Sequence, residues 1–179
     1  MKRRIWATAI GYQAVWLCAV AGAGRGLAWP GVTAGALFVA AMLAVASRPA
    51  QEAMLAAAAI GAGALLDGGL AASGWLRYAA AWPAPAFAPA WILALWAAFA
   101  TTLPVLLPAW LRAPLPAALL GAIGGPLAYL GAARGFGAVE FVAPGPALVT
   151  LALGWAVALA ALAMLARSTP RPAATETIR

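Results

Sequence analysis

The sequence contains no histidine and a single cysteine, Cys18. One cysteine cannot form an intramolecular disulfide, and without histidine the His/Cys clusters that hold zinc cannot be assembled. A Ser-His-Asp triad and a histidine-ligated haem are excluded for the same reason. We therefore predict no metal site and no cofactor, and we expect Cys18 to be a buried, unmodified thiol.

Charged residues are also scarce. They make up 8% of the 179 residues, whereas 66% are hydrophobic, and the mean hydropathy is +0.95. A soluble domain of this size needs more charged side chains to cover its surface, so we expect lipid to be the main solvent. The net charge of +7 does not indicate nucleic-acid binding, because the basic residues are scattered singly except for Lys2-Arg3-Arg4.

Long apolar runs, separated by Arg, Pro and Gly, dominate the chain. They are rich in Ala and Leu, lack the alternation of a β-barrel, and can each cross a hydrocarbon core of about 30 Å. The predicted fold is all-α: a polytopic transmembrane helical bundle of about six helices. We expect one integral membrane domain over residues 1–166 and a disordered cytoplasmic tail over 167–179. The predicted spans cover residues 5–23, 31–47, 52–76, 88–111, 115–134 and 145–166.

The basic residues predict the orientation of the chain. With the N-terminus in the cytoplasm, eight Lys and Arg residues fall on the inner side and three on the outer side, as the positive-inside rule requires. Both termini are therefore expected in the cytoplasm. The inner residues are Lys2, Arg3, Arg4, Arg48, Arg112, Arg167, Arg171 and Arg179, and the outer ones are Arg25, Arg77 and Arg134.

Asp67 is the only aspartate and lies within an apolar run. Helical spacing places it on one face with Gly63, Ala71 and Gly74, a small-residue face that we expect to pack against neighbouring helices. An ionised carboxylate costs about 2.5–3.5 kcal/mol at the middle of a membrane, so Asp67 should face a partner or a cavity, or carry a proton. Two interpretations stay open: a functional, candidate catalytic carboxylate, or a structural hydrogen-bonding residue. The partners considered at its depth are Arg25, Arg77, Arg134, Glu140, Gln13, Tyr12, Thr101 and Thr102.

The arginines at the outer helix ends suggest a second candidate site. A guanidinium group binds phosphate through two parallel hydrogen bonds, but an arginine at a helix end also reaches lipid headgroups with no further role. Arg134 is the strongest candidate of the three because Glu140 follows soon after it. The candidate substrate-binding residues are Arg134, Glu140, Arg25, Arg77 and Gln13.

Thr101 and Thr102 precede Pro104, which leaves a carbonyl of the preceding turn without its helical donor. We expect both threonines to hydrogen-bond back to the helix backbone. Most tryptophans, Trp91 among them, lie near predicted span ends, as in interfacial belts. Three deeper tryptophans are expected in the core: Trp16, Trp96 and Trp155.

The most distinctive pattern lies in residues 89–141: Trp-x-x-x-x-Trp, then Phe-Ala-Thr-Thr-Leu, then Gly-Gly-Pro-Leu-Ala-Tyr. Together with "GYQAVWLCAVAGAG" near the N-terminus and "LLDGGL" around Asp67, it resembles a bacterial inner-membrane family known as domain of unknown function 2878. The resemblance covers nearly the whole chain except the tail. It implies a multi-pass protein of the bacterial inner membrane without an established reaction. Where many members have a polar residue after Thr-Thr-Leu, this chain has Pro104.

Genes of that family tend to lie near those for enzymes resembling cyclopropane-fatty-acid synthases and flavin amine oxidases. The resemblance therefore implies membrane lipids, and in addition lipid-modifying enzymes, as candidate partners. It implies nothing about an oligomeric state.

Three functions are compatible with these features. The first is an accessory protein or enzyme in membrane lipid modification, with a lipid headgroup or acyl chain near Arg134 and Glu140 and a polar cavity at Asp67. The second is a small transporter or flippase in which Asp67 carries a proton or an ion. Transporters commonly show repeats with broken helices in both halves, and the chain has only weak symmetry of this kind. The third is a membrane scaffold that recruits lipid-modifying enzymes.

Overall fold

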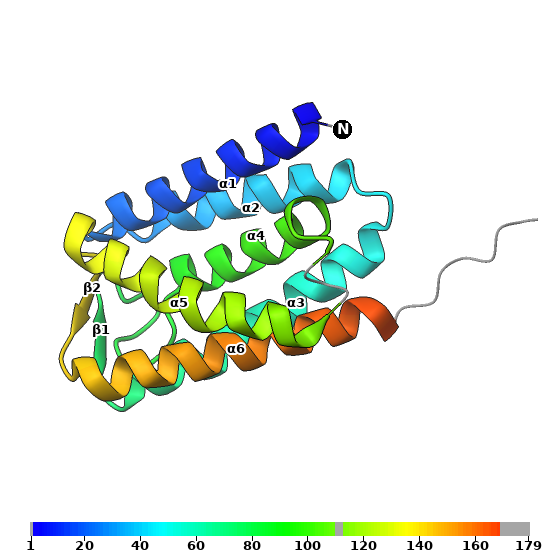
Figure 1. Ribbon diagram of the computed structural model, residues 1–179. Coiled ribbons are helices and arrows are strands. Elements are labelled where there is room, and N and C mark those ends of the chain that lie inside the picture. Colours follow the sequence, from blue (N-terminus) through cyan, green and yellow to red (C-terminus); the bar gives the residue numbers. More distant parts are fainter. Residues whose placement is uncertain (1, 110–112, 169–179) are drawn as a thin grey trace, which may run out of the picture.

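The computed structural model of the protein describes residues 2–109 and 113–168. Within them it contains six helices and two short strands (Figure 1). The helices confirm the predicted helical bundle, whereas the two strands were not expected. The helices are α1 (Lys2–Ala23), α2 (Trp29–Ala44), α3 (Pro49–Ala72), α4 (Ala90–Leu106), α5 (Pro114–Phe136) and α6 (Pro144–Ser168), and the strands are β1 (Leu76–Tyr78) and β2 (Val139–Phe141).

Four of these helices, α1, α3, α5 and α6, are long and apolar enough to cross a membrane. α2 and α4 are shorter, with 16 and 17 residues. α4 ends at Leu106, five residues before the end of the predicted span 88–111, because Pro104 removes a backbone donor and Pro108 follows. Of the predicted tail 167–179, residues 167 and 168 belong to α6, and residues 169–179 lie outside the described residues, as do residues 110–112 with Arg112.

Prolines and a glycine set the ends of several helices. α2, α3 and α5 each have a proline in the first turn, where the missing N–H has no intrahelical partner to lose. α5 ends at Gly137, which adopts a left-handed conformation with φ of 63°. The N–H groups of Gly137 and Ala138 then donate to the carbonyls of Ala133 and Ala132, both at 3.1 Å, and close the helix.

α4 occupies the centre of the bundle and packs against α1, α2 and α3, while α5 packs mainly against α6 (Figure 1). α1 and α5 meet at one end, where Gly24 lies against the carbonyl of Phe136. Along the rest of their length these two helices make few contacts. The start of α1 and the end of α6 lie at the same end of the bundle (Figure 1), and the assignment of that end to the cytoplasm stays a prediction.

The two strands pair at the opposite end of the bundle (Figure 1). They are antiparallel, and Arg77 lies opposite Glu140. In β1 the side chains alternate, so that Leu76 and Tyr78 are buried and Arg77 is exposed. The sheet thus covers one end of the bundle and directs Tyr78 inward.

The prediction for Thr101 and Thr102 is confirmed. The Thr101 hydroxyl donates to the carbonyl of Ala98 at 2.8 Å, and the Thr102 hydroxyl donates to the carbonyl of Phe99 at 2.7 Å. Both threonines are buried, and their bonds to the preceding turn satisfy hydroxyl groups that would otherwise lack partners in the core.

Two single-residue predictions are wrong. Cys18 is exposed on α1 rather than buried. Trp91 is buried rather than interfacial, because β1 folds over the start of α4: the Trp91 ring packs edge-to-face with Tyr78, and its Nε1 donates to the carbonyl of Ala79 at 3.0 Å. Trp96 lies in the core as expected, whereas Trp16 and Trp155 are only partly buried.

Candidate functional site

Asp67 is fully buried, with 0% of its surface exposed. It lies on the small-residue face predicted for this helix: Gly63 and Ala71 are buried on the same side of α3. The Trp96 ring of α4 lies directly over Gly63, where a larger side chain would overlap it. Gly74 falls outside the helix, in a turn with φ of 71°. The small residues therefore let α4 approach closely enough for its side chains to reach Asp67.

Three neutral donors converge on the Asp67 carboxylate. The hydroxyls of Tyr78 and Tyr129 both donate to Oδ1, the first at 2.8 Å, and the indole Nε1 of Trp96 donates to Oδ2 at 2.8 Å. The donors come from β1, α5 and α4, so one carboxylate on α3 connects four elements of the fold. We refer to Asp67, Tyr78, Trp96 and Tyr129 as the Asp67 cluster.

Tyr78 reaches this cluster because of the pattern of β1. The sequence Leu-Arg-Tyr alternates apolar and charged residues, which places Tyr78 on the inner face of the strand. Burial, and then the negative charge of Asp67, raise the pKa of the Tyr78 hydroxyl above its ordinary value. The hydroxyl therefore keeps its proton and acts as a donor to the carboxylate.

None of the residues that we expected as partners of Asp67 hydrogen-bonds to it. The outer arginines lie at the same end of the bundle but do not converge on one point among the described residues. Arg77 pairs with Glu140 at 3.6 Å across the sheet, with both side chains exposed (68% and 64%). Arg25 donates to the carbonyl of Ala21 at 3.1 Å, and Arg134 is exposed in the last turn of α5. Arg134 and Glu140 thus stay candidate headgroup contacts at the surface.

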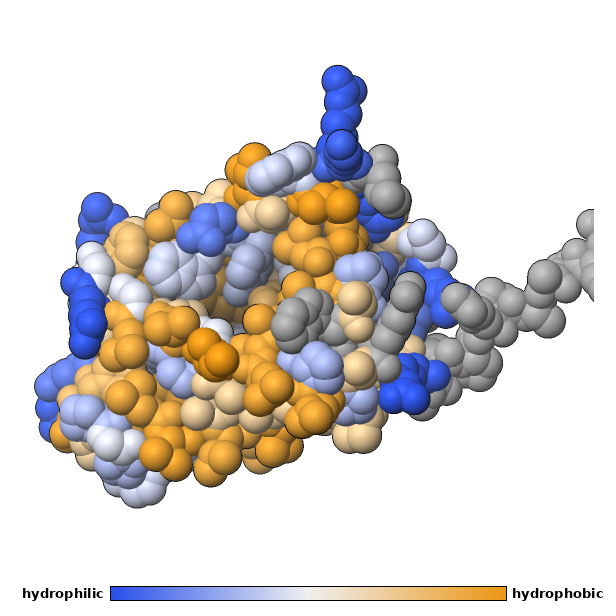
Figure 2. All heavy atoms as spheres, viewed as in Figure 1, coloured by the Kyte–Doolittle hydropathy of each residue, from blue (hydrophilic) through white to orange (hydrophobic). Residues whose placement is uncertain are grey.

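A cleft opens between α1 and α5, the two helices that meet only at one end. Its volume is about 480 Å³, and Figure 2 shows this face of the molecule hollowed between α1 and α5. The predicted site residue Gln13 lies on its wall. We define the cleft by Tyr12, Gln13 and Trp16 of α1, Gly124 and Gly131 of α5, and Trp155 of α6.

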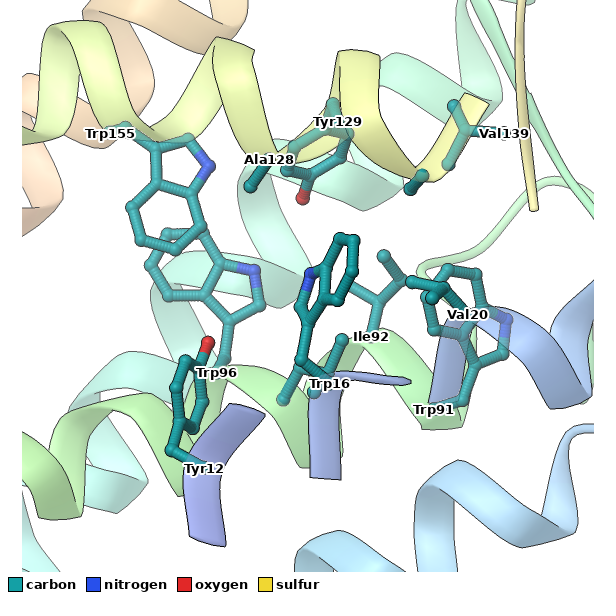
Figure 3. Close-up of a pocket in the computed structure, with 12 residues that line it drawn as sticks. Tyr12, Trp16, Val20, Trp91, Ile92, Trp96, Ala128, Tyr129, Val139 and Trp155 are labelled. Carbon is teal, nitrogen blue, oxygen red and sulfur yellow. The ribbon is translucent and has the colours of Figure 1, made fainter. Parts of the chain in front are cut away.

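The cleft continues into a smaller aromatic pocket of about 50 Å³ (Figure 3). The two spaces share Tyr12, Trp16, Ala128 and Trp155 as lining residues. Inside the pocket, Trp96 stacks on Trp155 with ring centroids 3.8 Å apart. We define the aromatic pocket by Tyr12, Trp16, Trp91, Trp96, Tyr129 and Trp155.

Tyr129 links the pocket to the Asp67 cluster, because its ring lines the pocket and its hydroxyl bonds to Asp67. Asp67 itself does not line the pocket. Figure 3 shows the Tyr12 hydroxyl and the Trp16 indole nitrogen turned toward the space that Tyr129 also faces. Neither group makes a hydrogen bond within the described residues, and the buried Nε1 of Trp155 lies near the Tyr129 oxygen without completing a hydrogen bond to it.

The lining of both spaces is uncharged. Among the described residues, aromatic, aliphatic and glycine side chains surround them, with the Gln13 amide as the most polar group. The described residues also include no group of three His, Cys, Asp or Glu side chains placed to bind a metal ion. The arrangement can hold an apolar molecule that has a small, uncharged polar group.

Sequence reasoning did not assign Tyr78, Trp96 and Tyr129 to the site. A signal was available for two of them: Trp96 and Tyr129 close the Trp-x-x-x-x-Trp and Gly-Gly-Pro-Leu-Ala-Tyr patterns. Their neutral polar groups can satisfy a buried carboxylate without a countercharge. Tyr78 could be found only by reading the alternation of residues 76–78 as a strand.

The model of the family described as "Protein of unknown function (DUF2878)" matches residues 5–161, and the chain therefore belongs to this family. No match was found among curated proteins or among solved structures.

Proposed function

We propose that this member of the family is a lipid-binding protein of the bacterial inner membrane that serves as an accessory protein in membrane lipid modification. The observation that carries the proposal is the cleft between α1 and α5, which continues into the aromatic pocket. Such a cleft gives a lipid chain a lateral entrance along two helices, without passage through water.

The glycines of α5 support this proposal. At Gly124 a side chain would meet open space, and at Gly131 the nearest atom to an added Cβ would be the Trp16 ring at 3.7 Å. Glycine in a helix is less favourable than alanine by about 0.5–1 kcal/mol. Its use where no neighbour approaches is consistent with space kept for a ligand.

A lipid gains little hydrophobic free energy by moving from the bilayer into an apolar cleft, because both surroundings are apolar. Shape and the few polar groups of the pocket must therefore determine which lipid is held. The exposed Arg134 and Glu140, near the sheet end, are the proposed contacts for a headgroup of a lipid or for a partner enzyme at the membrane surface.

Transport remains the weaker proposal. It requires Asp67 to exchange a proton or an ion with water, whereas the carboxylate is fully buried and both of its oxygens already accept hydrogen bonds. An enzymatic role of Asp67 requires direct contact with a substrate, and Tyr129 and Trp96 stand between Asp67 and the pocket.

The proposal is tested by filling the cleft. Gly124→Leu places a side chain in the cleft at a position where an added Cβ meets no neighbour, and Gly61→Leu is the matched control on α3, where an added Cβ also meets open space. Binding of a fluorescent C16 lipid to the purified protein in detergent should be lost in Gly124→Leu and unchanged in Gly61→Leu. Equal binding by both variants would contradict lipid binding in the cleft.

The accessory role is tested in cells. Lipidomics of a strain that lacks the gene should show altered acyl or headgroup species. Gly61→Leu should restore the normal lipids and Gly124→Leu should not, at equal amounts of protein in the membrane. An unaltered lipidome in the deletion strain would contradict a part in lipid modification.

A further inference from the structure

We propose that the aromatic pocket binds the hydroxyl group of a neutral lipid, and that the Tyr129 oxygen accepts the hydrogen bond from this hydroxyl. This inference rests on the proposed lipid-binding function and names the chemical class of the lipid. It places Asp67 as a positioning residue, which acts through Tyr129 and does not touch the ligand.

The hydrogen bond between Tyr129 and Asp67 runs in one direction. The Tyr129 hydroxyl donates its only proton to Oδ1 of Asp67. What Tyr129 can offer to the pocket is therefore a lone pair of its oxygen. A donor that bonds to a carboxylate also becomes a better acceptor, because hydrogen bonds in a chain polarise one another. Tyr129 thus presents an acceptor to the pocket.

The pocket also contains hydrogen-bond donors. The Tyr12 hydroxyl and the Trp16 indole face the pocket without a hydrogen-bond partner among the described residues (Figure 3). The Trp155 Nε1 is buried near the Tyr129 oxygen but does not complete a hydrogen bond to it. An indole N–H can only donate. The pocket therefore combines acceptors, the oxygens of Tyr129 and Tyr12, with several donors, and an alcohol group, which can donate one hydrogen bond and accept another, matches both.

The lining of the cleft and the pocket carries no charge, because no charged side chain among the described residues lines either space. An anionic headgroup would lose its hydration without a countercharge and would approach the Asp67 carboxylate. A quaternary ammonium group could lie against the aromatic faces, but it has no proton to donate to Tyr129. An uncharged hydroxyl fits the lining best.

The cleft provides a path for the hydrocarbon chain of the ligand. Because the cleft and the pocket share Tyr12, Trp16, Ala128 and Trp155, a molecule can place its hydroxyl group in the pocket and its hydrocarbon chain beside Gly124 and Gly131. A long-chain alcohol or a neutral glyceride with a free hydroxyl has this form.

The experiment compares four C16 ligands that differ only in the polar group: hexadecanol, methyl hexadecanoate, hexadecanoate and hexadecyltrimethylammonium. Each competes with the fluorescent C16 lipid for the purified protein in detergent. We expect hexadecanol to bind about tenfold more tightly than the methyl ester, which only accepts hydrogen bonds, and the two ions to bind more weakly still. Preference for the ester or for either ion would overturn the inference.

A pair of tyrosine variants tests the role of Tyr129. Tyr129→Phe and Tyr78→Phe each remove one hydroxyl from Oδ1 of Asp67, but only Tyr129 lines the pocket. Tyr129→Phe should weaken hexadecanol binding about fivefold to tenfold and leave the ester unchanged, whereas Tyr78→Phe, which loosens the Asp67 cluster without touching the ligand, should leave the ratio of the two affinities unchanged. Equal effects of both variants would show a purely structural role and would overturn the inference.

Asp67→Asn tests the positioning role through ligand selectivity. Because the Trp96 indole can only donate, the amide oxygen must face Trp96 and the amide nitrogen must face the tyrosines. Tyr129 then accepts from Asn and turns its own proton toward the pocket. The binding of the methyl ester relative to hexadecanol should rise about fivefold. An unchanged ratio of the two affinities would contradict the positioning role of Asp67.

The two proposals fail differently. If none of the four ligands displaces the fluorescent lipid, or if Gly124→Leu binds like the native protein, the lipid-binding function itself fails. If all four bind equally and Tyr129→Phe has no effect, lipid binding stands and only the assignment to a hydroxyl group fails.

Discussion

Two rows of glycines on α5 serve opposite purposes. Gly121 and Gly125 are buried against α6, where an added Cβ would overlap the Trp155 backbone at the first position and the Trp155 ring at the second. All four glycines line the cleft, but at Gly124 and Gly131 an added Cβ would meet nothing or only the edge of Trp16. One row brings two helices together, and the other keeps a space open between two helices.

A stripe of small residues therefore does not by itself indicate whether a helix packs against a neighbour or borders an open space. Close approach through glycine stabilises helix pairs in lipid, and α5 uses it toward α6. On the adjoining face the same residue type has no partner helix, because α1 diverges from α5 beyond the contact of Gly24 with Phe136.

The largest expected effect is that of Gly121→Ala. The added methyl group overlaps the carbonyl of Trp155, and a backbone group within a helix cannot rotate away. We expect a loss of about 3 kcal/mol or more in the free energy of unfolding, because overpacking against a rigid neighbour is costly. The measurement is unfolding in mixed detergent micelles, followed by tryptophan fluorescence. Stability equal to that of the native protein would show that α5 and α6 are not in close contact.

Gly125→Ala should have an intermediate effect. Here the methyl group overlaps the Trp155 ring, a side chain that can shift, so we expect a loss of about 1–3 kcal/mol. The control is the same substitution in a Trp155→Ala background. Removal of the ring should reduce the loss, and strictly additive losses in this double-mutant cycle would contradict the contact.

Gly124→Ala should have the smallest effect, and of the opposite sign. The methyl group meets open space, and alanine is the better helix former, so stability should rise by up to about 1 kcal/mol. The substitution is chemically identical to Gly121→Ala and lies three residues away on the same helix. Destabilisation similar to that of Gly121→Ala would mean that the cleft is closed by a packed neighbour.

Much of the fold could be predicted from the sequence, because the relevant signals are local. Apolar runs broken by Pro and Gly predicted the helices, and the spacing of Gly63, Asp67 and Ala71 predicted the buried face of α3. The hydroxyls of Thr101 and Thr102 bond within their own helix, as expected, although they reach the carbonyls of Ala98 and Phe99 rather than that of Ala100, which Pro104 leaves without a donor.

The site could not be predicted to the same extent, because its residues meet across long sequence distances. The donors to Asp67 come from β1, α4 and α5, and no local pattern indicates which elements approach one another. The strands span three residues each, too short for alternation to stand out beside the neighbouring prolines and glycines. Gly121, Gly124, Gly125 and Gly131 recur along one helix, and only the tertiary structure separates those packed against α6 from those beside open space.

We propose that a lipid alcohol occupies the cleft between α1 and α5. The most direct test is photo-crosslinking with a C16 alcohol that carries a diazirine in its chain, followed by peptide mapping in the presence and absence of unlabelled hexadecanol. We expect adducts on α1 near Tyr12 and Trp16 and on α5 between Gly124 and Gly131, and we expect hexadecanol to remove them. Adducts spread over outward-facing positions such as Leu65, which is 82% exposed, and insensitive to hexadecanol would contradict the claim.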